Sequence, residues 1–285
     1  MAPVRESGFH ATFNCLWCGR PHATRSGDDL EGWAMLCSSC VAKAQDNEFL
    51  RYRLRDGLNR RAEVTKLRDA DAREMKEYYA ARAPEYDELY SGSWFPPVEQ
   101  ALFLSDLDAA ALWLDALPMN GEIVELAAGT GWWSTLLASK GQLWLYDVGE
   151  EMLDLARQRL MAHGMRAHIH LRDAWAEPDR QVDALFCGGW LSHVPRARLD
   201  EFLAICRRWL KPGGTFAFID EAATWGGEPS VDEHQQRRLK DGREFSILKI
   251  YYEPAELEKA LLRAGFARAE VRTTSRFFLI GQATA

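Results

Sequence analysis

Short apolar runs, separated by turns and amphipathic stretches, fill the C-terminal two-thirds of the chain. Apolar runs of four to eight residues between turn signals are typical of buried strands, and apolar positions three or four apart are typical of helices. The pattern predicts an amphipathic helix over Glu256–Gly265. It predicts strands over Glu122–Leu126, a segment ending at Asp147, Ala167–Leu171, Val182–Gly189, Thr215–Asp220 and Phe277–Gly281. Strands that alternate with helices in this way favour an α/β fold.

A glycine-containing turn follows the first of these strands. Residues 123–131 read Ile-Val-Glu-Leu-Ala-Ala-Gly-Thr-Gly, and Asp147 follows sixteen residues later, at the end of the next strand. Gly129 and Gly131 let backbone N–H groups approach a ligand that a Cβ would block. The acid is placed to accept both hydroxyls of a ribose. Together the turn and the acid predict a site for an adenosine-containing cofactor.

The residues after the turn argue against two common adenosine ligands. A dinucleotide fingerprint needs a third glycine, where this chain has Ser134, and Trp132 and Trp133 fill the first turn of the expected helix. A pyrophosphate binds favourably at a narrow helix N-terminus that is lined by glycines. Two indoles at this place therefore argue against a dinucleotide. The Gly-Lys-Ser/Thr of a P-loop is also absent after the turn.

Three motifs carry a resemblance to a known family. The pattern Glu125-x-x-x-Gly129-x-Gly131 resembles the first motif of class I S-adenosylmethionine-dependent methyltransferases, and the runs that begin at Asp147 and Arg172 resemble the second and third. Over roughly residues 76–285, the resemblance implies a Rossmann-like methyltransferase fold with a seven-stranded, mostly parallel sheet. It implies S-adenosylmethionine as cofactor, bound by Glu125, Ala127, Gly129, Gly131, Asp147, Met152, Asp173, Ala174 and Gly189.

The resemblance also assigns roles within that set. Asp147 would hold the ribose, Met152 would lie under the adenine, and Asp173 with the Ala174 N–H would meet the adenine's amino group and a ring nitrogen. Ala127 stands where many members of the family have glycine. Because alanine is also small, we expect the backbone to stay accessible there.

Two further segments resemble parts of small-molecule methyltransferases. The tyrosine-rich run Tyr78–Tyr90 is similar to the entrance helix that covers cofactor and substrate, and Tyr79, Arg82 and Tyr86 share one helical face. The alternative is that these are ordinary aromatics of an amphipathic helix. The resemblance implies cofactor contacts for Tyr79 and Tyr86.

The segment Gly188–Pro195 supplies the candidate catalytic residue. It resembles a Trp-Leu-Ser-His-Val-Pro segment of bacterial small-molecule methyltransferases, in which His193 would face the transferred methyl and take a proton from the acceptor. Alternatively, His193 caps a helix start by a hydrogen bond to the backbone.

Polar and aromatic residues nearby bear on the acceptor. Asp220 and Glu221 could orient a substrate, or they could simply be exposed acids. The cations of 237–249 could meet an acidic substrate, or they could line the polar side of an edge strand. For these cations the edge strand is the preferred interpretation. The chain has 11 tryptophans, and four of them fall on loops at the expected site edge. Aromatic walls suit a flat aromatic or heteroaromatic acceptor. Those four are Trp94, Trp132, Trp190 and Trp225.

Four cysteines form a second motif near the N-terminus. Cys15, Cys18, Cys37 and Cys40 make two Cys-x-x-Cys pairs, the zinc-ribbon pattern, and such pairs close a tetrahedral site around structural zinc. A closed site leaves no position for catalysis, so the metal is expected to fold its segment. Three arginines stand against four acids in residues 1–40, and the whole chain has a net charge of −7, so nucleic acid is an unlikely partner.

These observations define a working hypothesis. We expect a zinc-binding module over 1–45, a helical connector and active-site lid over 46–100, and the methyltransferase domain over 101–285. The enzyme would methylate O or N of a small, aromatic or heteroaromatic metabolite; the alternative is an RNA or protein methyltransferase whose ribbon captures the macromolecule. A cytoplasmic location is expected because signal-peptide and membrane-spanning patterns are missing. The N-terminal module or the connector could form a homodimer.

Overall fold

Side-chain alternation along the strands builds the central sheet of the larger of two units. The computed structural model describes residues 12–15, 17–24, 28, 35–44, 72–223 and 233–285, and the chain divides into units over 1–70 and 71–285. In the larger unit, Val124 and Leu126 of one strand enter one apolar cluster, while Ile123 enters the other. Because successive side chains of a strand point to opposite faces, the sheet has a core on each face.

The sheet has seven strands in the order β10-β11-β7-β6-β3-β4-β5. Strands β3 to β7 run parallel, whereas β11 lies antiparallel to both β7 and β10. The sheet is therefore mostly parallel, as the family resemblance predicts. The strands are β3 (Gly121–Leu126), β4 (Gly141–Asp147), β5 (His168–Leu171), β6 (Val182–Gly188), β7 (Leu210–Glu221), β10 (Arg268–Thr273) and β11 (Phe278–Thr284).

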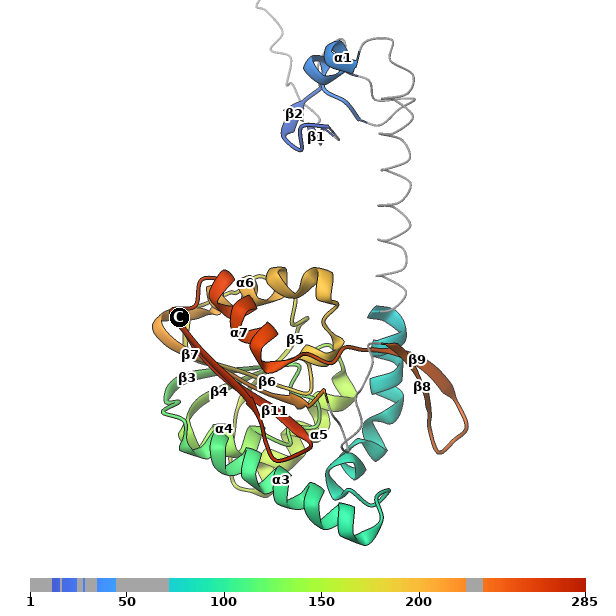
Figure 1. Ribbon diagram of the computed structural model, residues 1–285, viewed down its shortest axis with the longest axis vertical. Helices are drawn as coiled ribbons and strands as arrows, with labels where there is room; N and C mark the ends of the chain where they lie inside the picture. The colour runs from blue at the N-terminus through green and yellow to red at the C-terminus, as the bar shows by residue number, and fades with distance from the viewer. Residues whose placement is uncertain (1–11, 16, 25–27, 29–34, 45–71, 224–232) are drawn as a thin grey trace, which may run out of the picture. The chain divides into compact units, whose positions relative to one another are not determined.

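Helices cover both faces of the sheet (Figure 1). One face packs against α6 (Leu199–Trp209) and α7 (Pro254–Arg263), whose apolar residues join the cluster of Val124. The other face packs against α3 (Pro97–Ala116), α4 (Ser134–Lys140) and α5 (Glu150–Ala162). The carboxyl ends of the parallel strands stay free of these helices, and this is the edge where doubly wound sheets bind ligands.

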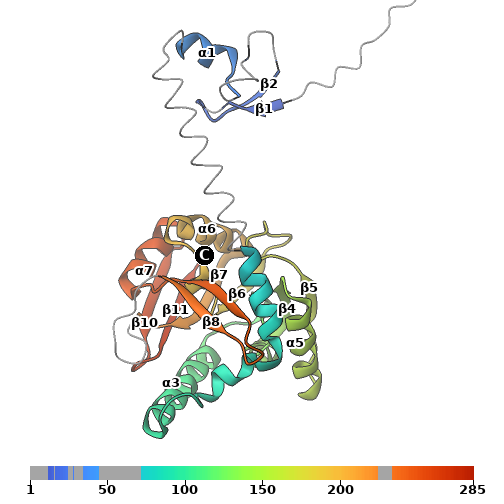
Figure 2. The same ribbon diagram turned by 90° about the vertical axis from the view of Figure 1, so that its right-hand side faces the viewer.

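A helix and a hairpin lie at that edge (Figure 2). The helix covers residues 72–82 and continues into the 3-10 helix η1 (Ala83–Ser91). The hairpin consists of β8 (Glu233–Arg238) and β9 (Glu244–Lys249), which pair only with each other among the described strands. Tyr78, Leu239 and Ile247 form a small apolar cluster that packs the helix against the hairpin.

Two features add to the sequence prediction, and two predicted features fall outside the described residues. The cations of 237–249 lie on this separate two-stranded hairpin, and the sequence pattern did not reveal β10, which forms one edge of the main sheet. β7 begins at Leu210, five residues before the strand predicted over Thr215–Asp220, and its register with β6 shifts between Val182 and Ala184. The predicted connector falls mostly on 45–71, and Trp225 on 224–232, both outside the described residues.

The smaller unit holds a short hairpin and one helix. Strands β1 (Thr12–Asn14) and β2 (Pro21–Ala23) pair antiparallel, and α1 covers Ser38–Ala44. Its apolar core contains Phe13 and Leu36 together with three cysteines. Across the described part of both units, no helix combines the length and apolar character that a membrane crossing requires.

Candidate active site

The glycine turn after β3 adopts a left-handed backbone at three positions. Ala127 has φ 51°, Gly129 has φ 55° and Gly131 has φ 74°. For a residue with a Cβ this conformation costs about 1–2 kcal/mol, so Ala127 occupies a position that favours glycine. A Cβ on Gly131 would lie 2.9 Å from the Cα of Ala156, so this glycine lets the turn pack against α5.

Asp147 at the end of β4 is tied to the glycine turn by the backbone. Its Oδ2 accepts the N–H of Gly129 at 2.9 Å, and its Oδ1 accepts the N–H of Gly149 at 2.8 Å. Burial raises the pKa of this carboxyl, although these N–H groups act in the opposite direction. The two contacts fix the carboxylate beside the turn while each oxygen keeps a lone pair for a further donor.

Glu125 lies beneath the turn and outside the cavity. Its side chain is only 1% exposed, and Ser134 Oγ donates to its Oε2 at 2.6 Å. Burial raises the pKa of Glu125 to about 8, so the group carries a proton at neutral pH. Ser134 replaces the third glycine of a dinucleotide motif, and the structure shows that it joins the start of α4 to β3.

A cavity of about 420 Å³ opens above the turn, and we call it the cofactor chamber. Ten of the predicted residues line it: Tyr79, Tyr86, Ala127, Gly129, Asp147, Met152, Asp173, Ala174, Gly189 and His193. Glu125 and Gly131 are not among its lining residues. Segments from 72–86 and from four strand ends therefore meet here, as expected for a ligand at the carboxyl edge of the sheet.

The sequence prediction missed several lining residues of the 72–82 helix. Ala72, Met75 and Lys76 line the cofactor chamber with Tyr79, and so does Arg73. Positions 72, 75, 76 and 79 are three or four apart, which places them on one helical face. This periodicity could have revealed them, because Tyr79 was already assigned to the site.

Two contacts hold η1 over the glycine turn. Asp87 accepts the Thr130 hydroxyl at 2.6 Å through Oδ1 and pairs with Arg159 through Oδ2. Tyr90 stacks on Trp132 with ring centroids 4.0 Å apart. Trp132 lies just before α4 and not in its first turn, where the sequence predicted it, because α4 begins at Ser134. Its indole supports the covering segment, and η1 carries Tyr86 into the cofactor chamber.

A second cavity, which we call the acceptor chamber, adjoins the first. It has a volume of about 100 Å³. Its apolar wall is mostly aromatic. The aromatic residues are Tyr78, Tyr79, Tyr86, Tyr90, Phe103, Trp133 and Phe278, and the aliphatic ones are Leu89, Ile219 and Ile247. Its polar lining contains Arg82, Asp220, Glu221, Gln235, Arg237 and Lys249. Four residues line both chambers and form the boundary between them: Tyr79, Tyr86, Gly189 and His193.

His193 has a defined tautomer at this boundary. Its Nδ1 lies 2.8 Å from the carbonyl oxygen of Leu248, so Nδ1 is the donor and Nε2 the acceptor. Tyr79 Oη lies 2.6 Å from Nε2 and donates to it. Burial, and next the charge of Lys249, lower the pKa of His193 to about 3. The imidazole is therefore neutral near pH 7, with its basic nitrogen facing Tyr79.

The four tryptophans expected at the site edge have different positions. Trp190 lines the cofactor chamber, Trp132 supports η1, and Trp94 is 48% exposed beside Phe95. None of these three lines the acceptor chamber. Its aromatic wall comes mainly from tyrosines of 78–90, which the sequence associated with the lid.

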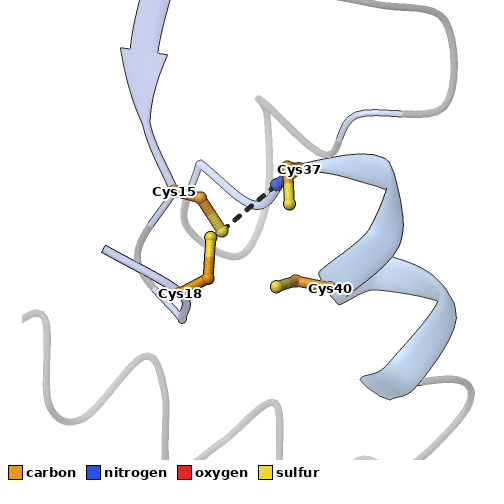
Figure 3. Close-up of side chains that lie close together, drawn as sticks. All are labelled: Cys15, Cys18, Cys37 and Cys40. Carbon is orange, nitrogen blue, oxygen red and sulfur yellow. Dashed lines mark hydrogen bonds between the residues drawn. The ribbon is translucent and has the colours of Figure 1, made fainter. Parts of the chain in front are cut away.

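The four cysteines converge in the smaller unit (Figure 3). The sulfurs of Cys15, Cys18, Cys37 and Cys40 all lie within 4.8 Å of one another. Tetrahedral zinc with Zn–S distances near 2.3 Å places its sulfurs roughly 3.8 Å apart, so the donor set and its spacing fit this metal. His22 lies outside the four, with Nε2 3.3 Å from the sulfur of Cys18.

The thiols have unequal acidities. Burial opposes ionisation of Cys15, but backbone N–H groups of Cys18 and Cys37 outweigh it and bring the pKa of Cys15 to about 6. Burial and the neighbouring sulfurs raise the pKa of Cys40 to about 12. Four thiolates so close together need a cation to balance their charge.

Fold and site together define a class of protein, and comparisons with known proteins agree. The family model described as a methyltransferase domain, Methyltransf_25, matches residues 123–214. The chain belongs to the S-adenosylmethionine-dependent methyltransferases and is of the small-molecule type.

Particular relatives support this assignment. The DhpI–SAH complex is 32% identical, covers 74% of this chain and 95% of its own, and has a TM-score of 0.61. The DhpI–SAM–HEP complex is 31% identical, covers 75% and 97%, and has a TM-score of 0.62. The ubiquinone/menaquinone biosynthesis C-methyltransferase UbiE of Laribacter hongkongensis is 24% identical over 173 residues, which are 54% of this chain and 70% of UbiE.

Proposed function

We propose that this enzyme methylates an oxygen or nitrogen of a small, aromatic or heteroaromatic acceptor bound in the acceptor chamber. The hydrogen bond between Tyr79 and His193, at the boundary of the two chambers, carries the proposal. S-adenosylmethionine, when bound in the cofactor chamber, supplies a methyl group on a positively charged sulfur. The aromatic lining of the acceptor chamber favours a flat ring held by stacking.

The cofactor contacts follow from the lining of the first chamber. Asp147 is oriented by two backbone N–H groups and presents its remaining lone pairs to ribose hydroxyls. Met152 and the segment Asp173–Ala174 line the same chamber and would contact the adenine. Tyr79 and Tyr86 would close the chamber on the side of the reacting methyl.

The proton lost by the acceptor needs a base at the boundary. Neutral His193 offers Nε2, and its Nδ1–H is fixed on the Leu248 carbonyl, so the ring is already oriented to receive a proton. Tyr79 lies between this nitrogen and the chambers. A proton released by an O–H or N–H acceptor can pass to Nε2 directly or through the Tyr79 hydroxyl, which gives up its own proton as it gains the new one.

We further propose that the four cysteines bind one structural zinc ion. A complete set of four protein ligands leaves no open position for a substrate or water. The metal would therefore stabilise the smaller unit, whose described residues add only Phe13 and Leu36 to the cysteines of its buried core.

Calorimetric titration with S-adenosylhomocysteine tests the cofactor site first. We expect micromolar binding by the wild type, loss of about tenfold or more in Asp147→Ala, and no change in Asp154→Ala, an exposed acid of α5 that pairs with Arg157. Undetectable binding to the folded wild type would overturn the proposal.

The base is tested by turnover with a labelled methyl donor, after a screen of phenols and nitrogen heterocycles. His193→Gln should lower kcat by about 10²–10⁴-fold, with a much smaller change in the affinity for S-adenosylhomocysteine. The methylated atom is identified by NMR of the product. UbiE is named a C-methyltransferase, and a methyl group found on carbon would refute the O- or N-acceptor assignment.

A further inference from the structure

Two arginines of the acceptor chamber have no acidic partner among the residues that the structure describes. Arg82 lies over the rings of Tyr78 and Tyr86, at 5.5 Å and 5.4 Å from their centroids, and its Nη1 donates to the Tyr78 hydroxyl. Arg237, on β8, donates to the Gln235 side chain. Within the described part of the chain, neither guanidinium forms an ion pair with a carboxylate. Both are partly buried, so their charges are only partly hydrated.

The acids that line the chamber are already engaged. Glu221 Oε1 lies 2.8 Å from Nζ of Lys249, which also donates to Ser192 Oγ at 2.9 Å. Asp220 accepts the backbone N–H of Ser192 at 3.0 Å and that of Glu221 at 2.8 Å. Glu221 therefore balances Lys249, and the lining as a whole holds three cations, Arg82, Arg237 and Lys249, against two acids, Asp220 and Glu221.

The acids at the rim do not neutralise the arginines either. Glu85 and Glu88 border a neighbouring cavity with Arg82 and Arg237. Glu88, however, pairs with Nζ of Lys240, and Glu85 accepts the Lys240 backbone N–H at 3.4 Å. Among the described residues, two cations without an acidic partner thus line one chamber of a chain whose net charge is −7.

The position of the arginines suits one end of a small ligand. Both line the acceptor chamber and an adjoining cavity of about 320 Å³, and neither lines the cofactor chamber. His193, in contrast, lines both the acceptor chamber and the cofactor chamber. A ligand whose reacting atom lies near His193 can therefore place its other end beside the arginines.

We infer that the methyl acceptor carries an acidic group, a carboxylate or a phosphate, bound by Arg82 and Arg237. The inference rests on the proposed function in taking this chamber as the acceptor's site. Guanidinium groups match both anions, and charge-assisted hydrogen bonds of this kind are about twice as strong as neutral ones. The group would lie beyond the tyrosine-lined part of the chamber, while the accepting atom faces His193.

Calorimetry with paired probes tests the inference without requiring turnover. The full-length protein, saturated with S-adenosylhomocysteine, is titrated with 4-hydroxybenzoate against its neutral counterpart 4-hydroxybenzamide, and with phenyl phosphate against phenol. We expect at least one anion to bind about tenfold or more tightly than its neutral counterpart. The pair that shows the preference distinguishes carboxylate from phosphate.

Two variants assign the preference to the arginines. Arg237→Gln should abolish most of it, whereas Arg243→Gln should keep it, because Arg243 lies on the same hairpin but pairs with Asp241 and lines neither chamber. Equal affinities within both pairs, no anion binding at all, or an unchanged preference in Arg237→Gln would each overturn the inference. The same titrations without S-adenosylhomocysteine show whether the anion site exists even where cofactor binding, and with it the proposed function, fails.

Discussion

At the scale of single residues, burial and hydrogen bonding decide the protonation state of the ionisable side chains in the site. Glu125 is a buried acid and Asp147 a half-buried one, and both lie near strand ends. Asp147 receives two backbone N–H groups and faces a chamber, whereas Glu125 receives only Ser134 and faces none. We therefore expect Asp147 to bind ligand as a carboxylate and Glu125 to serve as a neutral part of the core.

The burial of His193 should make the free energy of unfolding depend on pH. An unfolded histidine takes up a proton near pH 6.5, whereas folded His193 has a pKa lowered to about 3 by burial and the Lys249 charge. Because the folded value is the lower one, this contribution to stability is complete above about pH 6.5 and is lost as pH falls toward 3. Between pH 6.5 and pH 5 the loss is about 2 kcal/mol.

Urea unfolding of the wild type and His193→Gln at pH 7 and pH 5 measures this contribution. The free energy of unfolding should fall by about 2 kcal/mol more in the wild type than in the variant. Taking the difference between the two proteins removes the effects of all other titrating groups. Equal losses would show that His193 is protonated freely in the folded protein.

At the scale of elements, η1 depends on tertiary contacts for its position. Asp87 joins it to Thr130 and Arg159, and Tyr90 stacks on Trp132. These partners lie after β3 and on α5, so the same segments that form the cofactor chamber also hold its cover. The position of η1 should therefore be sensitive to the loss of one of these partly buried contacts.

Asp87→Ala should weaken binding of S-adenosylhomocysteine by roughly tenfold, because it removes a charged hydrogen bond and frees the element that carries Tyr86. Glu88→Ala is the matched control on the same element. Its pair with Lys240 is exposed on both sides, and such pairs contribute little. Calorimetry on both variants measures the difference; equal affinities would show that η1 keeps its place without Asp87.

At the scale of the whole molecule, the sequence revealed what lies close together along the chain. The strands β3 to β6, the glycine turn and Asp147 are local patterns, and the structure shows these strands within one or two residues of their predicted bounds. The acceptor chamber is not local, because Tyr79 and His193 are 114 positions apart and the hairpin lies further on. The packing of the hairpin against the 72–82 helix decides which cations face a chamber. The periodicity of the sequence does not predict this packing.

The two units have separate cores, which makes their independence testable. Phe13, Leu36 and three cysteines form the core of the smaller unit, and the two large clusters belong to residues 71–285. Cys37→Ala should release the proposed zinc, measured by a metal-sensitive dye, and leave the affinity for S-adenosylhomocysteine within about twofold of the wild type. Asn14→Ala, an exposed change in the same unit, should retain the metal. Loss of cofactor binding in Cys37→Ala would show that the larger unit depends on the smaller one.

The β8–β9 hairpin has a consequence for how this enzyme could diversify. It supplies Gln235, Arg237, Ile247 and Lys249 to the acceptor chamber, none of its residues lines the cofactor chamber, and it pairs with no strand of the main sheet. Substitutions there can alter the choice of acceptor while the machinery for the methyl donor stays constant. The side chains that the hairpin points into the acceptor chamber are thus the first positions to vary when redesigning what the enzyme methylates, while its backbone stays in place because the Leu248 carbonyl orients His193.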